Sequence, residues 1–410
     1  MRHYSRKSVL KYFSVRVRAV VVLLLATTIP TVDLARPAVA AEKTFQFNVR
    51  AARDVETFRA YAELAARMKK YGHVQIAISG IADKAWFQIP AGGSPWHQYA
   101  CYVSAPWMFY PHPRLAPHFP AEWIEANRAL LQAKRAVINE LGLKAIFAGK
   151  NSQMLPESFF VENPHLRGPR VDHPRRSRGE AFAWCVDLPE TREMIESMMA
   201  EMLRSAPEIE VFSSGTNDAG SGLCWAAAQY PGPNGPRHCM NRSAGQRVRD
   251  LVLAVLRGAR AGGGQIDFRW SNVNFWQNEM DVVLPLLPEN AFIDSRDHSR
   301  MGGVGTLINE AWPFMGLIDP LSVIQSMERY HDPEIRVLSV GSSAMYARHE
   351  DSPETVSKLL DLVEICIANP TTNLSQRLEL LRMVAGRWAG ERASASRCSR
   401  PFTTSTGRWS

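Results

Sequence analysis

Apolar residues along most of the chain recur in two patterns, one typical of amphipathic helices and one typical of short buried strands. Over residues 55–68, apolar side chains fall three or four positions apart behind Asp54, a residue type that caps helix amino-termini. Gly72 marks the end of this segment, and the run 73–79 is rich in Val, Ile and Ala. The pattern therefore predicts a helix followed by a strand.

The same unit repeats down the chain, with helices that end at Gly142, at Pro207 and in the glycines 262–264. The predicted strands are 73–79, 143–148, 181–186, 209–213, 266–270, 291–294 and 335–340, and 363–368 is either an eighth strand or the end of the preceding helix. Seven or eight strands that alternate with helices require a parallel sheet, so the α/β class is expected. In about 330 residues, over 42–372, the closed (β/α)8 TIM-like barrel is the predicted architecture.

A doubly wound open sheet is the alternative architecture. Such sheets often carry a glycine phosphate loop after a strand, and the chain contains neither a G-x-G-x-x-G motif nor a P-loop. The segments after the predicted strands are long and rich in Trp, Pro, Arg and Asp, whereas the segments before them are short. In a barrel this asymmetry places the elaborate loops at the carboxyl ends of the strands, where barrel enzymes work.

The amino-terminal segment has the pattern of a secretory signal peptide. A basic region is followed by the apolar run 19–29, by Pro30 and by small residues at 38–40. We therefore expect residues 1–41 to be cleaved and the protein to be secreted or periplasmic, with no membrane span afterwards. The apolar run has about half the length that spans a bilayer, and an uncleaved anchor is the alternative.

Net charge gives no argument for a nucleic-acid partner. The whole chain has a net charge of +8, but residues 1–41 hold seven basic residues and one acid, so the predicted mature chain is only +2. The high pI comes largely from the two ends.

The most unusual segment follows the predicted strand 209–213. It places Asn217 and Asp218 among small residues, with Trp225 and Tyr230 downstream. A carboxylate at the tip of a barrel strand can act as general acid in glycoside cleavage when an apolar wall raises its pKa, and Asn217 is expected to position the sugar. The alternative is ordinary turn chemistry, since Asn, Asp and Gly are common loop residues.

The segment after strand 143–148 contains Arg167, Arg170 and Asp172. Guanidinium groups can bind the carboxylates or sulfates of an acidic sugar, and Arg–Asp pairing that fixes a long loop is the alternative. Hydrolysis by two carboxylates needs a partner for Asp218. The later strand ends offer Asp294 and Glu310 as catalytic candidates, and Asn272, Asp297 and His298 as substrate-binding candidates.

No motif predicts a metal or a cofactor, because C-x-x-C, H-E-x-x-H and G-x-S-x-G are all absent. Cys224 and Cys239 are the closest pair of cysteines in the folded part. In an oxidising compartment a disulfide between them would close a loop of about 15 residues and contribute roughly 3 kcal/mol. Two buried free thiols are the alternative.

Several of these stretches resemble the barrel domain of bacterial proteins grouped with glycoside hydrolases of the α-glucuronidase and β-hexosaminidase type. The similar stretches are Asn217-Asp218-Ala-Gly-Ser-Gly with Cys224-Trp225, Tyr230 to Pro236, Arg167-Gly-Pro-Arg170-Val-Asp172, and Cys185-Val-Asp187. The resemblance covers roughly residues 45–390. It implies an exported glycoside hydrolase that cleaves a polysaccharide or glycan by carboxylate acid/base chemistry, with a non-catalytic carbohydrate-binding barrel as the alternative. In the group the acid at the fourth strand usually belongs to a Glu-containing signature, and here Asn217-Asp218 takes that place.

The carboxyl-terminal part departs from the barrel pattern. The pattern over residues 373–392 predicts a helix that belongs to an otherwise missing helical domain. Residues 393–410 are predicted to be a disordered or aberrant tail. Leu378, Leu381, Val384 and Trp388 form one apolar stripe on this helix. We expect the stripe to stay exposed and to promote self-association.

Overall fold

The computed structural model describes residues 42–49, 52–82, 93–94, 104–149, 154–215, 222–227, 229–271, 277–294, 304–308, 320–332, 335–341 and 353–389. Eight strands form one sheet, in the order β8-β7-β6-β3-β2-β1-β10-β9. They are β1 (Lys43–Asn48), β2 (Gly72–Ala77), β3 (Lys144–Gly149), β6 (Ile209–Gly215), β7 (Asp267–Ser271), β8 (Ala291–Asp294), β9 (Val304–Ile308) and β10 (Val337–Gly341). Every pairing between neighbours is parallel.

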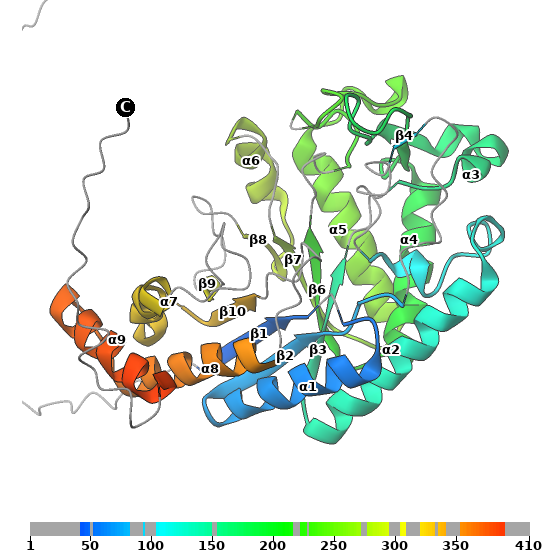
Figure 1. Cartoon of the computed structure of the whole chain (residues 1–410). Coiled ribbons are helices and arrows are strands. Elements are labelled where there is room, and N and C mark those ends of the chain that lie inside the picture. Colours follow the sequence, from blue (N-terminus) through cyan, green and yellow to red (C-terminus); the bar gives the residue numbers. More distant parts are fainter. Residues whose placement is uncertain are drawn as a thin grey trace, which may run out of the picture. The chain divides into compact units, whose positions relative to one another are not determined.

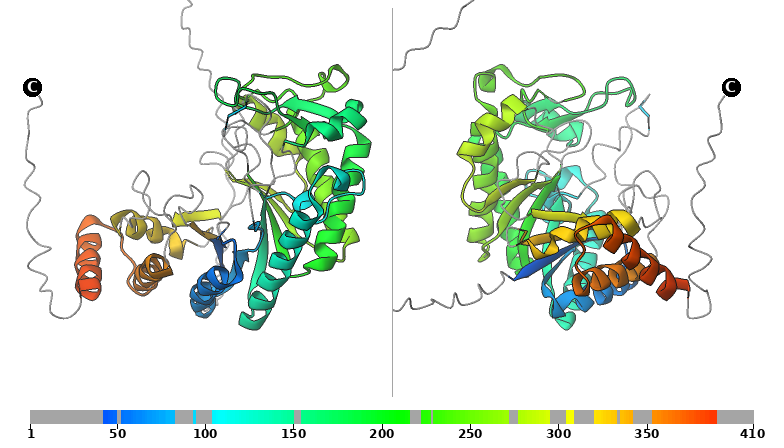
Figure 2. Two further views of the ribbon diagram at one scale, coloured as in Figure 1. Left: turned by 45° about the vertical axis from the view of Figure 1, so that its right-hand side comes forward. Right: turned by 90° about the vertical axis from the view of Figure 1, so that its left-hand side faces the viewer.

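The strand order is that of a (β/α)8 barrel opened at one seam. From β1 to β8 each strand lies beside the strand before it in the sheet, and β10 returns to pair with β1. A doubly wound sheet would instead reverse direction at a switch point. The sheet is curled (Figures 1 and 2), and no pairing among the described residues joins β8 to β9.

Helices cover the outer face of this sheet (Figure 1). They are α1 (Val55–Ala66), α2 (Ala121–Leu141), α4 (Pro189–Ser205), α5 (Ala244–Ala261), α7 (Pro320–Met327) and α8 (Pro353–Ala368). Two further helices pack on these, α6 (Gln277–Val283) on α5 and α9 (Leu374–Ala389) on α7 and α8. Helix α1 begins where predicted, because the Asp54 side chain accepts the backbone N–H of Thr57. Helix α2 ends at Gly142, whose φ of 63° suits a residue without a Cβ.

The two faces of the sheet differ in polarity because side chains alternate along each strand. The face toward the helices is apolar, and Phe147, Phe212 and Phe268 stack across three adjacent strands with ring centroids 5.4 and 5.6 Å apart. The opposite face carries a hydrogen-bonded polar chain. Gln46 Nε2 donates to Gln75 Oε1 at 2.7 Å, and Gln75 Nε2 donates to Glu210 Oε2 at 2.9 Å.

The structure differs from the predicted strands at both ends of the list and in the middle. Strands β1, β4 and β9 were not predicted, and the segment 181–186 does not join the barrel sheet. It holds β5 (Phe182–Trp184), which pairs antiparallel with β4 (Arg167–Arg170) in a separate two-stranded sheet. Of the two alternatives for residues 363–368, the structure shows the end of helix α8. A short apolar run fits a barrel strand and a side hairpin equally well, so periodicity alone could not separate them.

The carboxyl-terminal helix packs against the fold, contrary to the expectation of an exposed stripe. Val384 is fully buried, Leu381 and Trp388 pack against the main core, and only Leu378 is 39% exposed. Helices α7 and α8 supply the face that covers α9. Self-association stays a prediction. No helix in the described part of the chain is long and apolar enough to cross a membrane, and the predicted signal peptide lies outside that part.

Candidate functional site at the carboxyl edge of the sheet

Two long loops, which follow β3 and β6 in sequence, lie next to each other in their described parts. The described part of the β3 loop runs over 154–188 and contains α3 (Glu157–Glu162), β4 and β5, and that of the β6 loop covers 222–227 and 229–243. Asn234 joins them, because its Oδ1 accepts the backbone N–H of Arg170 at 2.6 Å and its Nδ2 donates to Arg170 O at 3.3 Å. We call this pair of loops the loop layer.

The predicted arginines are engaged by carboxylates within the β3 loop. Arg170 donates from Nε and Nη2 to both oxygens of Asp172, at 2.6 and 2.9 Å, and from Nη1 to Glu180 at 2.7 Å. Asp172 is 2% exposed and also accepts the backbone N–H of Ala181 at 3.0 Å. This is the Arg–Asp pairing considered above, and it holds the pKa of Arg170 above its ordinary value, chiefly through the hydrogen bond to Asp172.

Arg167 is held in the same way at the other end of β4. Its guanidinium pairs with both carboxylate oxygens of Glu157. Its flat face also lies over the rings of Phe160 and Phe182, at 5.0 and 4.6 Å from the centroids. Both arginines therefore fix the conformation of the β3 loop.

The two predicted aromatic platforms belong to the β6 loop. Trp225 has a left-handed backbone conformation with φ of 60°, and its Nε1 donates to Pro236 O at 3.0 Å. Tyr230 is 40% exposed, and its ring centroid lies 4.2 Å from that of His173 on the β3 loop. The indole is therefore fixed in place, and the phenol is partly open to solvent.

The remaining predicted site residues cannot be placed. Asn217, Asp218, Asn272, Asp297, His298 and Glu310 lie outside the described residues, and Asp294 ends β8 with its side chain undescribed. One buried carboxylate that the sequence reasoning missed is Glu279 on α6. It is 8% exposed, and its Oε1 accepts the backbone N–H of Ala227 at 2.8 Å, so it ties helix α6 to the β6 loop.

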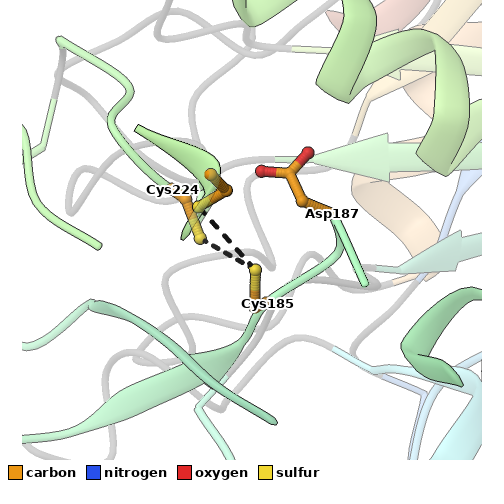
Figure 3. Close-up of side chains that lie close together, drawn as sticks. Cys185, Asp187 and Cys224 are labelled. Atoms are coloured by element: carbon orange, nitrogen blue, oxygen red, sulfur yellow. Dashed lines mark hydrogen bonds between the residues drawn. The ribbon is translucent and has the colours of Figure 1, made fainter. Parts of the chain in front are cut away.

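Three cysteines meet inside the loop layer, which the sequence reasoning did not anticipate. The sulfur of Cys185, directly after β5, lies 3.6 Å from that of Cys224 and 3.9 Å from that of Cys239 (Figure 3). All three are buried and free, so the predicted Cys224–Cys239 bridge is not formed in this structure. The physical reason is that Cys185 joins the pair, although it is far from both in sequence. Hydrogen bonds with Cys224 and Cys239 lower the pKa of the Cys185 thiol.

A buried ion pair lies beside the cysteines. Asp187 is 7% exposed, and Arg247 on α5, which is 2% exposed, donates from Nε to Asp187 Oδ2 at 2.7 Å. Arg242 lies 3.2 Å from Asp187 Oδ1. Burial raises the pKa of Asp187 although both guanidinium groups oppose that shift. Helix α4 begins after Leu188 without a side-chain cap, because the Asp187 carboxylate turns toward α5.

No model of a known protein family and no curated protein matches this chain. Among solved structures, a pneumococcal GH20 exo-β-D-N-acetylglucosaminidase module aligns over 85% of this chain and 92% of its own, with 11% identity and a TM-score of 0.47. A GH138 enzyme targeting pectin rhamnogalacturonan II aligns over 85% and 41%, with 10% identity and a TM-score of 0.45. A GH27 β-L-arabinopyranosidase from Geobacillus stearothermophilus aligns over 79% and 77%, with 8% identity and a TM-score of 0.41. Likenesses of this size assign neither a substrate nor a mechanism to the chain.

Proposed function

We propose that this chain is an exported glycoside hydrolase that cleaves a polysaccharide or glycan. The observation that carries the proposal is the loop layer, because it lies at the carboxyl edge of a parallel sheet with barrel strand order. In barrel enzymes this edge bears the catalytic groups. The Asn217-Asp218 segment directly follows β6 in sequence and leads into the loop that fixes Trp225.

In this proposal Asp218 is the general acid/base and Asn217 positions the sugar. Trp225 and Tyr230 provide aromatic surfaces for a sugar ring, whose C–H face stacks on apolar rings. The partner carboxylate is Asp294 or Glu310, and the separation of the two carboxyl groups determines whether configuration is retained or inverted. Since Arg167 and Arg170 are already paired with carboxylates, we assign them the role of shaping the β3 loop.

The test is hydrolysis of a broad panel of chromogenic α- and β-glycosides of hexoses, hexosamines and uronic acids. The wild type is expected to cleave at least one of them, and Asp218→Asn is expected to lose about 10²–10⁴-fold in kcat, the usual contribution of a general acid/base. Glu193→Gln is the matched control, a carboxyl-to-amide change at an exposed position of α4. Its activity should equal that of the wild type.

Two outcomes would contradict the proposal in different ways. A wild type that binds sugars in calorimetry but cleaves none of the panel is a carbohydrate-binding barrel and no enzyme. An Asp218→Asn variant with full activity moves the acid/base role to another carboxylate and leaves hydrolysis intact.

Export has its own test. Protein recovered from the periplasm or the medium is expected to lack residues 1–41, and amino-terminal sequencing reads this directly. Recovery of the uncleaved chain in the membrane fraction would support the anchor instead.

A further inference from the structure

The three-cysteine cluster joins three separate parts of the chain. Cys185 follows β5 in the β3 loop, Cys224 lies in the β6 loop, and Cys239 precedes helix α5. All three are at most 1% exposed. Together with Asp187, their ligand atoms all lie within 4.8 Å of one another. Three buried thiols in mutual contact are a soft donor set of the kind that selects Zn²⁺ over harder cations.

The sulfur separations fit a tetrahedral zinc centre. A Zn–S distance of about 2.3 Å in a tetrahedron places two sulfurs about 3.8 Å apart. The separations from Cys185 are 3.6 Å to Cys224 and 3.9 Å to Cys239. The thiols are therefore already spaced as ligands of one ion, whereas a disulfide would require about 2.0 Å between two of them.

His238 is placed to supply the fourth ligand. Its Nε2 lies 3.4 Å from the Cys185 sulfur, and the corresponding nitrogen–sulfur separation in a Cys3His zinc site is about 3.5 Å. The His238 side chain is exposed, so it approaches the buried sulfurs from the solvent side. Asp187 is the competing ligand, because one of its carboxylate oxygens lies within 4.8 Å of the sulfurs. Arg247 holds its Oδ2, and its buried Oδ1 has no hydrogen-bond partner among the described residues.

The charge around the cluster is balanced with either His238 or Asp187 as fourth ligand. Three thiolates and Zn²⁺ carry a net charge of −1, and the neighbouring Asp187, Arg242 and Arg247 together carry +1. Arg247 Nη2 additionally donates to the backbone oxygen of Cys239 at 2.8 Å, which fixes one ligand from outside.

We propose that Cys185, Cys224, Cys239 and His238 form a structural Zn²⁺ site. All four positions are filled by protein, so the ion would act as a staple and not as a Lewis acid. It would hold the β3 loop, the β6 loop and the start of α5 together. Three of its four ligands, Cys224, His238 and Cys239, follow Asp218 in the β6 loop. The site is independent of the proposed hydrolysis, since it concerns metal content and stability.

The wild-type protein provides the first test. The full chain, produced with zinc in the medium and purified with an affinity tag that contains no histidines, is expected to contain one Zn²⁺ per molecule by elemental mass spectrometry. Replacement by Co²⁺ is expected to give a thiolate-to-metal charge-transfer band and the intense visible bands of tetrahedral cobalt. Two results would each overturn the proposal: zinc at background level, or a disulfide among these cysteines in non-reducing peptide mapping.

Variants locate the ion. Cys185→Ser, Cys224→Ser and Cys239→Ser are each expected to lose the bound Zn²⁺, whereas Cys366→Ser is expected to keep it. Cys366 is the matched control, because it is also a buried free cysteine but lies on α8. His238→Ala is expected to weaken Zn²⁺ retention against a chelator by at least the roughly 10–100-fold that supporting residues contribute. Retention unchanged in His238→Ala but lost in Asp187→Asn would overturn the assignment of the fourth ligand.

If the serine variants fail to fold, the Co²⁺ spectrum of the wild type still tests whether thiolates bind the metal. Cobalt bound without the thiolate band would place the metal elsewhere on the molecule and would refute the site.

Discussion

Apolar packing holds both the helices on the outer face of the sheet and the loop layer at its carboxyl edge, but the loop layer depends in addition on buried polar contacts. Helices α4 and α5 pack through continuous apolar faces that belong to the main core. The β3 loop contributes Phe159, Phe160 and Trp184 to the same core and has a small apolar cluster of its own, made of Met154, Val171, Ala181 and Ala183. It is also held by ion pairs, by Asn234 and by the three cysteines.

This difference indicates where the molecule tolerates conservative substitutions and where it does not. Burial of apolar area is non-directional, so a helix face accepts another side chain of similar volume. A buried charge or thiol needs its particular partner, and removing one member leaves the other unsatisfied. We therefore expect mild losses from conservative changes in the helix layer and large losses from equally conservative changes in the loop layer.

Phe212→Ala should give the largest loss, because this ring is fully buried between Phe147 and Phe268. The expected decrease in the free energy of unfolding is about 3–5 kcal/mol, from lost transfer energy and the cavity left behind. Urea denaturation measures it. Phe212→Leu keeps most of the volume and should cost clearly less, and equal losses for the two variants would mean that the stack is not held by volume filling.

Arg247→Met tests the loop layer with a change that roughly preserves volume. It removes the partner of Asp187 and leaves that carboxylate buried, so the expected loss is about 3 kcal/mol. Thermal denaturation is the measurement. The double variant Arg247→Met, Asp187→Leu should recover part of the loss. A single variant as stable as the wild type would show that this pair does not hold the loop layer.

Lys134 is the exception in the helix layer, and its effect depends on pH. It is fully buried on α2, donates to Ala52 O and Gly80 O, and burial lowers its pKa to about 7. Between that value and 10.5 the unfolded chain binds more protons than the folded chain, so this group makes stability rise with pH. From pH 7 to 9 the rise relative to Lys134→Met should be about 2 kcal/mol. Parallel stability curves for the two proteins would show that Lys134 keeps an ordinary pKa.

Arg377→Gln should have the smallest effect. Arg377 on α9 pairs with Glu328, and the two side chains are 25% and 17% exposed, so water screens the attraction. We expect a loss of no more than about 1 kcal/mol in chemical denaturation. A loss as large as that of Arg247→Met would remove the contrast between the helix layer and the loop layer.

The parts predictable from sequence are those that local pattern determines. The Asp54 cap, the stop at Gly142 and the stop at the glycines 262–264 each depend on a few neighbouring residues, and the structure confirms them. Strand β1 was not predicted although Phe45 and Phe47 alternate with polar residues, because no predicted helix precedes it and the repeated helix–strand unit is what indicates the other strands.

Contacts between distant residues were not predictable in the same way. Cys185 lies 39 residues from Cys224, and Asp187 lies 60 residues from Arg247, so no spacing rule connects them. Only the folded loop layer brings them together. The pairing of Cys224 with Cys239 was predicted because the two residues are close in sequence. Sequence proximity gives no sign of Cys185, the third member of the cluster.

The backbone conformation of Trp225 lowers the stability of the loop layer. A bulky residue with φ of 60° is held in a conformation that glycine adopts freely, at a cost of about 1–3 kcal/mol. Its backbone N–H donates to Asn234 O at 2.7 Å, so the neighbouring loop enforces that shape. A protein optimised only for thermal endurance would place glycine there. The left-handed backbone at Trp225 thus lowers the stability of the molecule, and under the proposed function the indole is kept there as the surface on which a sugar ring stacks.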